Sequence, residues 1–264
     1  MVFYFTATGN SLYTARQLDC ECCSIPQEIH GEMRYSADKT GIVCPVYGHE
    51  MPQLVKGFIA KASLETDYLY LILTYGSRHG GAAELAEEFA LSVGKCFDYI
   101  NVLLMQDNFL PAFDMTEQAK LEKHIPQQLE RIRSDISVRK NFVSEVTDED
   151  RAEHRQYLER MKKMPADAFK KLYRITEKCI GCGICTKVCP MGCFSLDEQR
   201  AKRSCISCIS CMACVHACPE AAIQLNIPEP NPNARYRNEN VSLMDIINAN
   251  WQKTGGNNHG ICNT

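Results

Sequence analysis

The spacing of cysteines is the feature that most constrains what this chain can fold into. Of 16 cysteines among 264 residues, ten fall in the 40-residue window from Cys179 to Cys218. The first half of the window reads Cys179-x2-Cys182-x2-Cys185-x3-Cys189-Pro190. Two-residue spacers let a tight loop turn three thiolates toward one centre, and the glycines between them let backbone N–H groups approach the sulfurs. This spacing is typical of metal or cluster ligands.

The second half of the window allows two registers. A run that started at Cys205 would place its fourth ligand at Val215. A run that starts three residues later repeats every spacing of the first, with its final proline, as Cys208, Cys211, Cys214, Cys218 and Pro219. We therefore predict that Cys208 begins the second run and that Cys205 is not a ligand. The repeat indicates two copies of a half that holds one cluster.

The repeated run resembles the two-[4Fe-4S] domains of bacterial-type ferredoxins, over about residues 172–226. In that family the fourth cysteine of each run binds the other cluster, so the resemblance implies crossed ligand sets. The first set is Cys179, Cys182, Cys185 and Cys218. The second set is Cys189, Cys208, Cys211 and Cys214. Structural zinc held by four cysteines per site is the alternative, although zinc sites favour paired C-x2-C knuckles.

Several cysteines fall outside the two runs. Cys193 and Cys205 are either spare ligands or small buried residues, and we predict the latter. Cys20 and Cys23, with Cys22 between them, have the C-x-x-C spacing of redox sites. They follow the first predicted helix instead of opening one, so the helix dipole that lowers a thiol pKa is missing, and we assign them no function. We expect Cys44 and Cys96 in the core, and Cys262 in a disordered Gly/Asn-rich tail.

The N-terminal part of the chain alternates apolar runs with segments of helical spacing. Strands are predicted at 2–5, 41–45, 68–74 and 97–105, and helices from Ser11, over 51–62 and over 80–93. A further edge strand is expected within 19–30. This order, with nearly continuous apolar strands, predicts a parallel sheet covered by helices on both faces.

The loop after the first strand suits an anion. It consists of Thr6, Ala7, Thr8, Gly9, Asn10 and Ser11. Unpaired backbone N–H groups and the positive end of a helix dipole meet there, and hydroxyl groups add neutral donors. The loop has neither the Gly-Lys-Ser/Thr of a Walker A motif nor a G-x-G-x-x-G fingerprint. A plain hydroxyl-rich helix cap is the alternative.

Two further loops follow predicted strands and place a tyrosine beside a glycine, which suits a flat aromatic ligand. They are Pro45, Val46, Tyr47, Gly48 and Thr74, Tyr75, Gly76, Ser77. The first loop, [ST]-x-T-G-N-[ST] after a strand, resembles the FMN phosphate loop of flavodoxins. The resemblance implies an α/β flavodoxin-like, doubly wound parallel sheet whose ligand lies beyond the carboxyl ends of the strands.

The whole chain resembles the flavodoxin/ferredoxin fusion proteins of anaerobic bacteria, over 3–11, 41–52, 74–82, 105–109 and 179–223. This resemblance implies FMN, two [4Fe-4S] clusters and a role in electron transfer between redox partner proteins. The sequence departs from the family at Cys20–Cys23 and at Arg78 and His79 in the third loop. His216, between two cluster cysteines, is expected to support a ligand rather than to be one.

We expect four regions: a flavodoxin-like FMN domain over 1–145, a helical linker over 146–171, a small α+β ferredoxin-like domain over 172–228, and an extension with a short helix over 229–264. An FMN-dependent reductase of a small molecule, fed by the clusters, is the alternative function. A regulatory protein that has lost FMN is disfavoured, because the loop keeps its hydroxyl groups.

The remaining composition excludes other classes of function. The chain opens with Met1–Phe5, an apolar run without a basic n-region, so we expect no secretory signal and a cytoplasmic location where thiols stay reduced. No apolar run approaches the ~18–20 residues of a membrane span. A net charge of −3 gives no indication of nucleic-acid binding.

Overall fold

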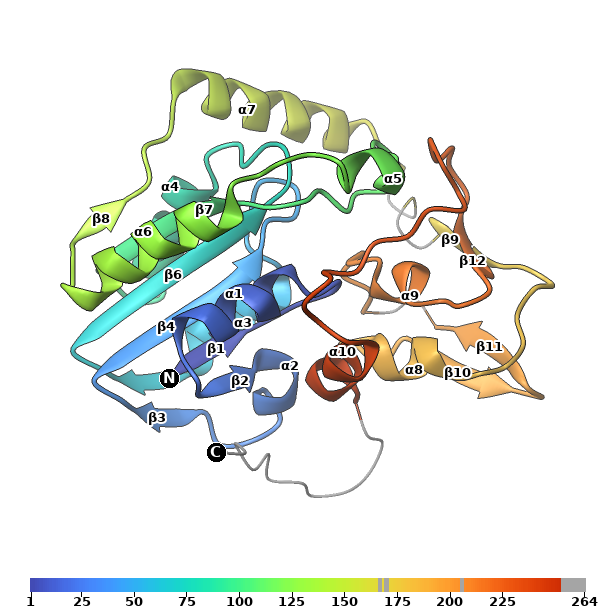
Figure 1. The fold of residues 1–264 in the computed structure, drawn as a ribbon, viewed down its shortest axis with the longest axis horizontal. Helices are drawn as coiled ribbons and strands as arrows, with labels where there is room; N and C mark the ends of the chain where they lie inside the picture. The colour runs from blue at the N-terminus through green and yellow to red at the C-terminus, as the bar shows by residue number, and fades with distance from the viewer. Residues whose placement is uncertain (166–167, 169–170, 205–206, 253–264) are drawn as a thin grey trace.

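The structure is a computed structural model that describes residues 1–165, 168, 171–204 and 207–252 (Figure 1). Cys205, Cys262 and the predicted disordered tail lie outside these residues. Within them, no helix combines the length and the apolar character needed to cross a bilayer.

A six-stranded sheet forms the N-terminal part of the molecule, and all its strand pairs are parallel. Its order is β2 (Cys22–Ser24), β1 (Val2–Tyr4), β4 (Lys39–Pro45), β6 (Tyr68–Tyr75), β7 (Tyr99–Leu104) and β8 (Phe142–Val143). The predicted parallel α/β sheet is therefore confirmed, including the edge strand expected within 19–30. The two-residue strand β8 was not predicted.

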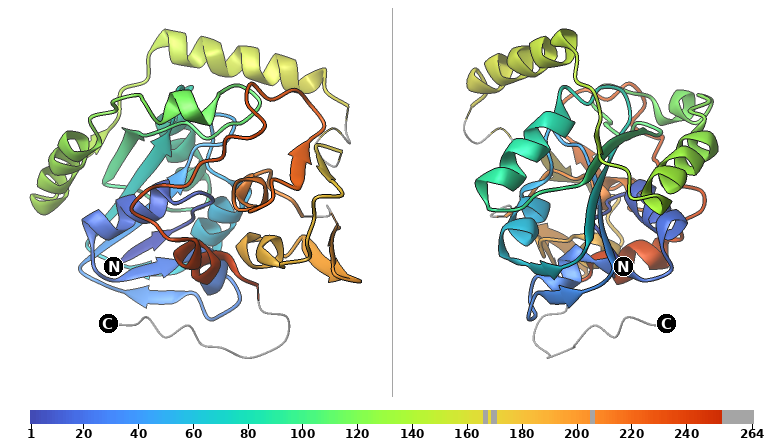
Figure 2. Two further views of the ribbon diagram at one scale, coloured as in Figure 1. Left: turned by 45° about the vertical axis from the view of Figure 1, so that its right-hand side comes forward. Right: turned by 90° about the vertical axis from the view of Figure 1, so that its left-hand side faces the viewer.

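Helices cover both faces of this sheet, as Figure 2 shows in its right-hand view. Because side chains alternate along a strand, Phe3 and Phe5 face one side of β1, and Val2 and Tyr4 face the other. The first side packs against α3 (Gln53–Lys61) and α4 (Ala82–Ser92). The second packs against α1 (Asn10–Leu18) and α6 (Ile125–Ser137).

Smaller elements complete this part of the chain. They are α2 (Ile25–Glu28), the parallel pair β3 (Arg34–Ser36) and β5 (Ser63–Glu65), α5 (Met115–Gln118) and α7 (Asp148–Lys162). Thr147 caps α7 through a capping box with Asp150, so this helix begins directly after residue 147. One prediction is wrong: Cys96 is exposed, because it lies in the turn between α4 and β7, whereas Cys44 is buried as expected.

The cysteine-rich segment forms a compact unit beside the carboxyl ends of the sheet strands (Figure 1). Its elements are β9 (Tyr173–Ile175) paired antiparallel with β12 (Ile223–Leu225), the hairpin β10 (Phe194–Asp197) and β11 (Arg200–Arg203), α8 (Ile184–Val188) and α9 (Ala213–His216). The chain then returns along the α/β part and ends its described portion in α10 (Leu243–Asn250), which contacts α8 and α2. This helix was predicted.

Candidate functional site

The two cysteine runs have the same backbone conformation, 29 positions apart. Positive φ angles recur at three equivalent pairs of positions: Gly181 (68°) and Ser210 (54°), Gly183 (74°) and Met212 (59°), Gly192 (59°) and Ala221 (46°). Each short helix, α8 or α9, begins just before the third cysteine of its run. The sequence repeat is therefore also a structural repeat. Cys193 occupies the position that Ala222 has in the second copy. It therefore corresponds to a small buried residue and not to one of the four cysteines of a run.

The structure brings the eight run cysteines together around two cavities. The first is lined by Cys179, Cys182, Cys185 and Cys218. The second is lined by Cys189, Cys208, Cys211 and Cys214. Each group combines three cysteines of one run with the fourth cysteine of the other, which is the crossed grouping that the family resemblance implies.

Backbone N–H groups are directed at four of these sulfurs. Ala201 donates to Sγ of Cys179 at 3.4 Å and Ser210 donates to Cys208 at 3.4 Å. The two fourth cysteines receive equivalent bonds: Cys193 N–H to Cys189 at 3.3 Å, and Ala222 N–H to Cys218 at 3.2 Å. Hydrogen bonds of this kind stabilise the thiolate form that binds metal.

The electrostatics of the thiols differ within the second group. Burial raises the pKa of Cys211 and Cys214 well above the ordinary value. A hydrogen bond with Cys193, and then the nearby Arg203 guanidinium, lowers the pKa of Cys208. Binding metal to the buried pair must therefore release protons, as expected for cysteine ligands.

Each set of four cysteines lines one cavity. Across the described ranges, no three His, Cys, Asp or Glu side chains are grouped closely enough to hold a single metal ion.

Residues 178–223 match the model of a family described as a 4Fe-4S dicluster domain. The match spans both cysteine runs and identifies this stretch as an iron–sulfur, ferredoxin-type domain. No curated protein and no solved structure matches the chain.

The predicted phosphate loop, Thr6–Ser11, lies between β1 and α1 and is buried throughout. Gly9 precedes the helix with φ of 107°, and no side chain caps the first turn. The loop hydroxyls have partners within the chain. Oγ1 of Thr6 accepts from Gly9 N–H at 3.0 Å, Oγ1 of Thr8 accepts from Asn108 at 2.6 Å, and Ser11 bonds to Thr74 at 2.9 Å.

A C-terminal segment, residues 236–241, covers this loop; we call it the strap. Asn238 N–H donates to the carbonyl of Thr8 at 2.8 Å, and a Cβ on Gly9 would meet Cβ of Asn238 at 2.9 Å. Beyond the strap, Asn250 donates to the carbonyl of Thr6 at 2.9 Å. Sequence reasoning missed this contact. The sequence signal for such a contact is the asparagine-rich composition after position 230, since side-chain amides both donate and accept hydrogen bonds.

The three predicted loops meet at the carboxyl ends of β1, β4 and β6. Ser11 of the first loop bonds to Thr74 of the third, and Val46 N–H of the second donates to the carbonyl of Thr74 at 2.9 Å. Gly76 lies against Asp107, where a Cβ would overlap the backbone. The chain therefore gathers these loops at one place, although Ser77 faces solvent.

Tyr47 of the second loop is turned toward the cysteine-rich segment. Its ring lies edge-on to Phe5, with centroids 6.3 Å apart, and it packs with Ile209 and Cys211 against the α3/α4 core. Burial raises its pKa, and the neighbouring Cys211 adds to this effect. This side chain therefore connects the α/β part to the second cavity.

Helix α7 lies across the second and third loops (Figure 1). Tyr157 contacts Gly48, and His154 lies 5.7 Å from His49 between ring centroids. His79 lies 5.1 Å from Tyr75 and pairs with Asp150 at 3.6 Å. Sequence reasoning identified His79 but missed the other two histidines, because α7 resembles an ordinary solvated helix. The three rings together form a histidine cluster over these loops.

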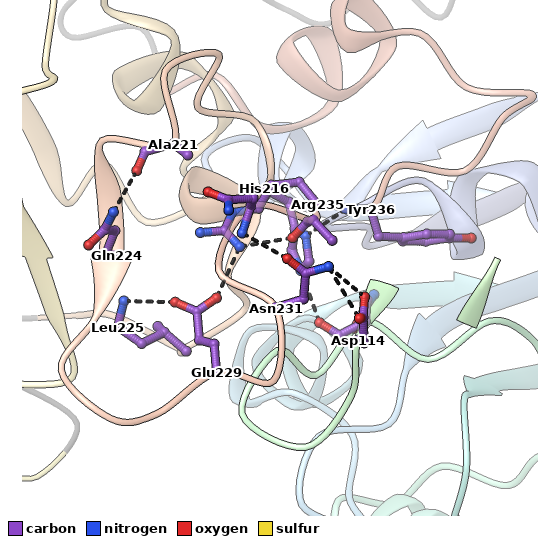
Figure 3. A network of polar contacts seen from close by, with 12 residues as sticks. Asp114, His216, Ala221, Gln224, Leu225, Glu229, Asn231, Arg235 and Tyr236 are labelled. Atoms are coloured by element: carbon purple, nitrogen blue, oxygen red, sulfur yellow. Dashed lines mark hydrogen bonds and ion pairs between the residues drawn. The ribbon is translucent and has the colours of Figure 1, made fainter. Parts of the chain in front are cut away.

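His216 connects three parts of the molecule (Figure 3). Its Nδ1 accepts from the N–H of Tyr236 in the strap at 3.0 Å, and its Nε2 lies 2.9 Å from the carbonyl of Asn108. Both contacts fix the neutral Nε2–H tautomer. Burial lowers its pKa to about 4. Both nitrogens are thus directed away from the cysteines, as expected for a residue that is not a ligand.

The same close-up shows how the returning chain is held in place (Figure 3). Arg235 and Glu229 form a buried ion pair at 3.0 Å, and Glu229 also accepts from Leu225 N–H at 3.3 Å. Asn231 donates to Asp114 at the start of α5. These contacts tie the chain before the strap to both the ferredoxin-type domain and the α/β part.

The Cys20–Cys23 group gives no sign of redox chemistry. Burial, and then Asp19, raises the pKa of Cys22 to about 11, and this residue starts the edge strand β2. A thiol that stays protonated is a poor nucleophile.

Proposed function

We propose that this chain is an electron-transfer flavo-iron–sulfur protein, with two [4Fe-4S] clusters and FMN. The observation that carries the proposal is the pair of cavities, each lined by a complete crossed set of four cysteines. One set is Cys179, Cys182, Cys185 and Cys218, and the other is Cys189, Cys208, Cys211 and Cys214. Clusters supply one-electron chemistry, and FMN supplies one- or two-electron chemistry.

The strand order supports the FMN half of the proposal. Apart from the short β8, the order β2-β1-β4-β6-β7 is the 2-1-3-4-5 order of the flavodoxin-like fold. In that fold, ligands bind at the point where the strand order reverses, here between β1 and β4. The Thr6–Ser11 loop follows β1 and the Pro45–Gly48 loop follows β4, so both flank this point.

The donors of the first loop fit a phosphate group. Uncapped N–H groups at the start of α1 and the hydroxyls of Thr6, Thr8 and Ser11 offer neutral donors, and no acidic residue lies in the first turn. We infer that these residues would hold the phosphate, and that Tyr75 with Gly76 would border the flavin ring. The strap lies directly on this loop, since Asn238 bonds to Thr8 and borders Gly9.

The protein's role in this mechanism is positioning. Tyr47 and Cys211 bring the second cavity against the α/β part, so electrons need not cross a wide aqueous gap. Helix α7 covers part of the second loop through the contact of Tyr157 with Gly48. Redox proteins, rather than nucleic acids or membranes, would then be the partners.

The experiment is anaerobic reconstitution followed by iron, sulfide and flavin assays on the full chain. The proposal expects about eight irons and about one FMN per chain. Zinc in place of iron would contradict the cluster half, and zinc without flavin would contradict both halves. Iron without flavin, after incubation with excess FMN, would contradict the FMN half.

A reductase of a small molecule is the second candidate, and the histidine cluster favours it. His49 and His79 lie beside the proposed flavin loops and could carry protons to a reduced product. Steady turnover of an added acceptor by the reconstituted protein alone would support this function over electron transfer.

A further inference from the structure

The second cavity has two hydroxyl groups beside it that lack partners. The hydroxyl oxygens of Tyr47 and Tyr173 are buried, and neither forms a hydrogen bond of normal geometry with the described residues, although the Ser210 side chain lies close to Tyr173. Leaving a hydroxyl buried and unpaired costs about 1–3 kcal/mol. Such groups point to a partner that is present only when a cofactor is bound.

The two tyrosines come from different parts of the chain and meet at the same group of sulfurs. Tyr173, on β9 of the ferredoxin-type domain, lines the second cavity together with Cys208, Cys211 and Cys214. Tyr47, in the loop after β4, packs against the α/β core, as Cys211 does, and the electrostatic effects of Cys211 and Tyr173 on its hydroxyl place all three side chains close together. A cluster bound in this cavity would present sulfur atoms as acceptors for both hydroxyls.

Arg203 adds a positive charge on the same side. Its guanidinium lies over the ring of Tyr173, 4.4 Å from the ring centroid. Hydrogen-bond donors and positive charge stabilise the reduced, more negative form of a cluster, and so raise its reduction potential.

The first cavity has a different lining. Besides its four cysteines it is bordered by glycine and apolar residues, and Glu220 is the one further ionisable residue among those that line it in the described structure. No tyrosine hydroxyl is among these lining residues. The Arg200 guanidinium lies near Cys179, but it is paired with the Glu177 carboxylate at 2.8 Å. The negative charge of Glu220 disfavours reduction. Cys182 and Ile180 of this cavity are exposed to solvent.

We propose that Tyr47 and Tyr173 donate hydrogen bonds to sulfurs of the cluster in the second cavity and make it the higher-potential cluster of the two. This proposal rests on the two-cluster function above. With both clusters bound, an electron taken from an external low-potential one-electron donor at the exposed first cavity would come to rest in the second cavity, without a proton, because Tyr47 and Tyr173 would stabilise the reduced state there. Electrons would thus be held next to the α/β part.

The test uses Tyr47→Phe and Tyr173→Phe in the reconstituted full chain, because each change removes only the hydroxyl. Redox titration followed by electron paramagnetic resonance gives one potential for each cluster. Each variant should lower the same potential by ~59 mV, which corresponds to a tenfold change in the reduced-to-oxidised ratio of a one-electron couple. The other potential should stay unchanged.

Tyr68→Phe is the matched control, since its hydroxyl donates to the carbonyl of Lys140, far from both cavities. It should move neither potential. Unchanged potentials in both test variants, or shifts in different clusters, would overturn the proposal. Iron content measured on the same samples shows whether both clusters are present, so failure of the two-cluster function is recognised separately from failure of this proposal. The flavin content of the samples does not affect this comparison of the two cluster potentials.

Discussion

The hydroxyl of Tyr236 donates a hydrogen bond of 2.6 Å to Oδ1 of Asn10, although 226 positions separate the two residues. Asn238 donates to the same oxygen at 3.2 Å. A single side chain at the start of α1 therefore holds the strap over the proposed phosphate loop.

Replacing Asn10 with alanine should destabilise the protein by about 1–3 kcal/mol, because two buried donors lose their acceptor. Alanine is a good helix former, so α1 itself should not weaken. Denaturation of the flavin-free protein, followed by circular dichroism, measures the change. Asn240→Ala, at an exposed position of the same strap, should change stability by less than about 0.5 kcal/mol. Equal effects of both variants would contradict the role given to Asn10.

The histidine cluster should make stability depend on pH. Burial, followed by the charges of His154, Arg160, His79 and Arg78, lowers the pKa of His49 from 6.5 to about 4. Between these values the unfolded chain binds a proton that the folded chain does not. The contribution of His49 is therefore complete above pH 6.5 and is lost as the pH falls toward 4.

The His49→Gln variant should flatten the fall in thermal midpoint between pH 7.5 and 5.5. The effect should stay below the ~1.4 kcal/mol per pH unit expected of one fully buried group, since this ring is partly exposed. The control is His30→Gln, at an exposed position just after α2, which should leave the pH profile unchanged. If His49→Gln left the pH dependence of the thermal midpoint unaltered, burial of His49 would not be the cause of that dependence.

Gly181 should tolerate no side chain. Its φ is 68°, and a Cβ would overlap the carbonyl of Gln199 in the β10–β11 turn. Gly181→Ala should therefore disturb the first cavity and reduce iron content and stability. Gly57→Ala is the matched control, because no atom lies within 4 Å of its Cβ position in α3. That control should be neutral or stabilising by about 0.5–1 kcal/mol.

Two cysteine variants should separate a ligand from a bystander. Cys182→Ser should remove the first cluster, which is about half of the iron, and should spare FMN. Cys193→Ala should keep the full iron content, because Ala222 occupies the equivalent position of the second copy. Iron and sulfide assays decide. If Cys193→Ala lost a cluster, this residue would have to be reassigned as a ligand.

The sheet and the cysteine groups could be predicted because their signals are local. Tyr68–Thr74 is almost continuously apolar and forms all of β6 except its last residue. The register of the second run could be predicted because a run starting at Cys205 would place its fourth ligand at Val215, and valine cannot bind a metal or cluster. Strand β8 could not be predicted, since its two residues carry no pattern and pair with β7 only through the tertiary fold.

The contacts that cover the proposed FMN site could not be predicted either. The strap reaches Gly9 from more than 220 residues away, and α7 reaches Gly48 with Tyr157. Such contacts depend on how separate segments pack, which spacing in a sequence does not encode. The exposure of Cys96 could not be predicted from residue type. Cysteine is commonly buried, but Cys96 is exposed because it lies in a turn.

The most direct test of the central claim is an anaerobic reductive titration of the reconstituted protein. Two clusters accept one electron each and FMN accepts two, so the account predicts uptake of about four electrons per chain, with flavin bleaching among the changes. Uptake of about two electrons without flavin bleaching would contradict the proposed union of clusters and FMN in one chain.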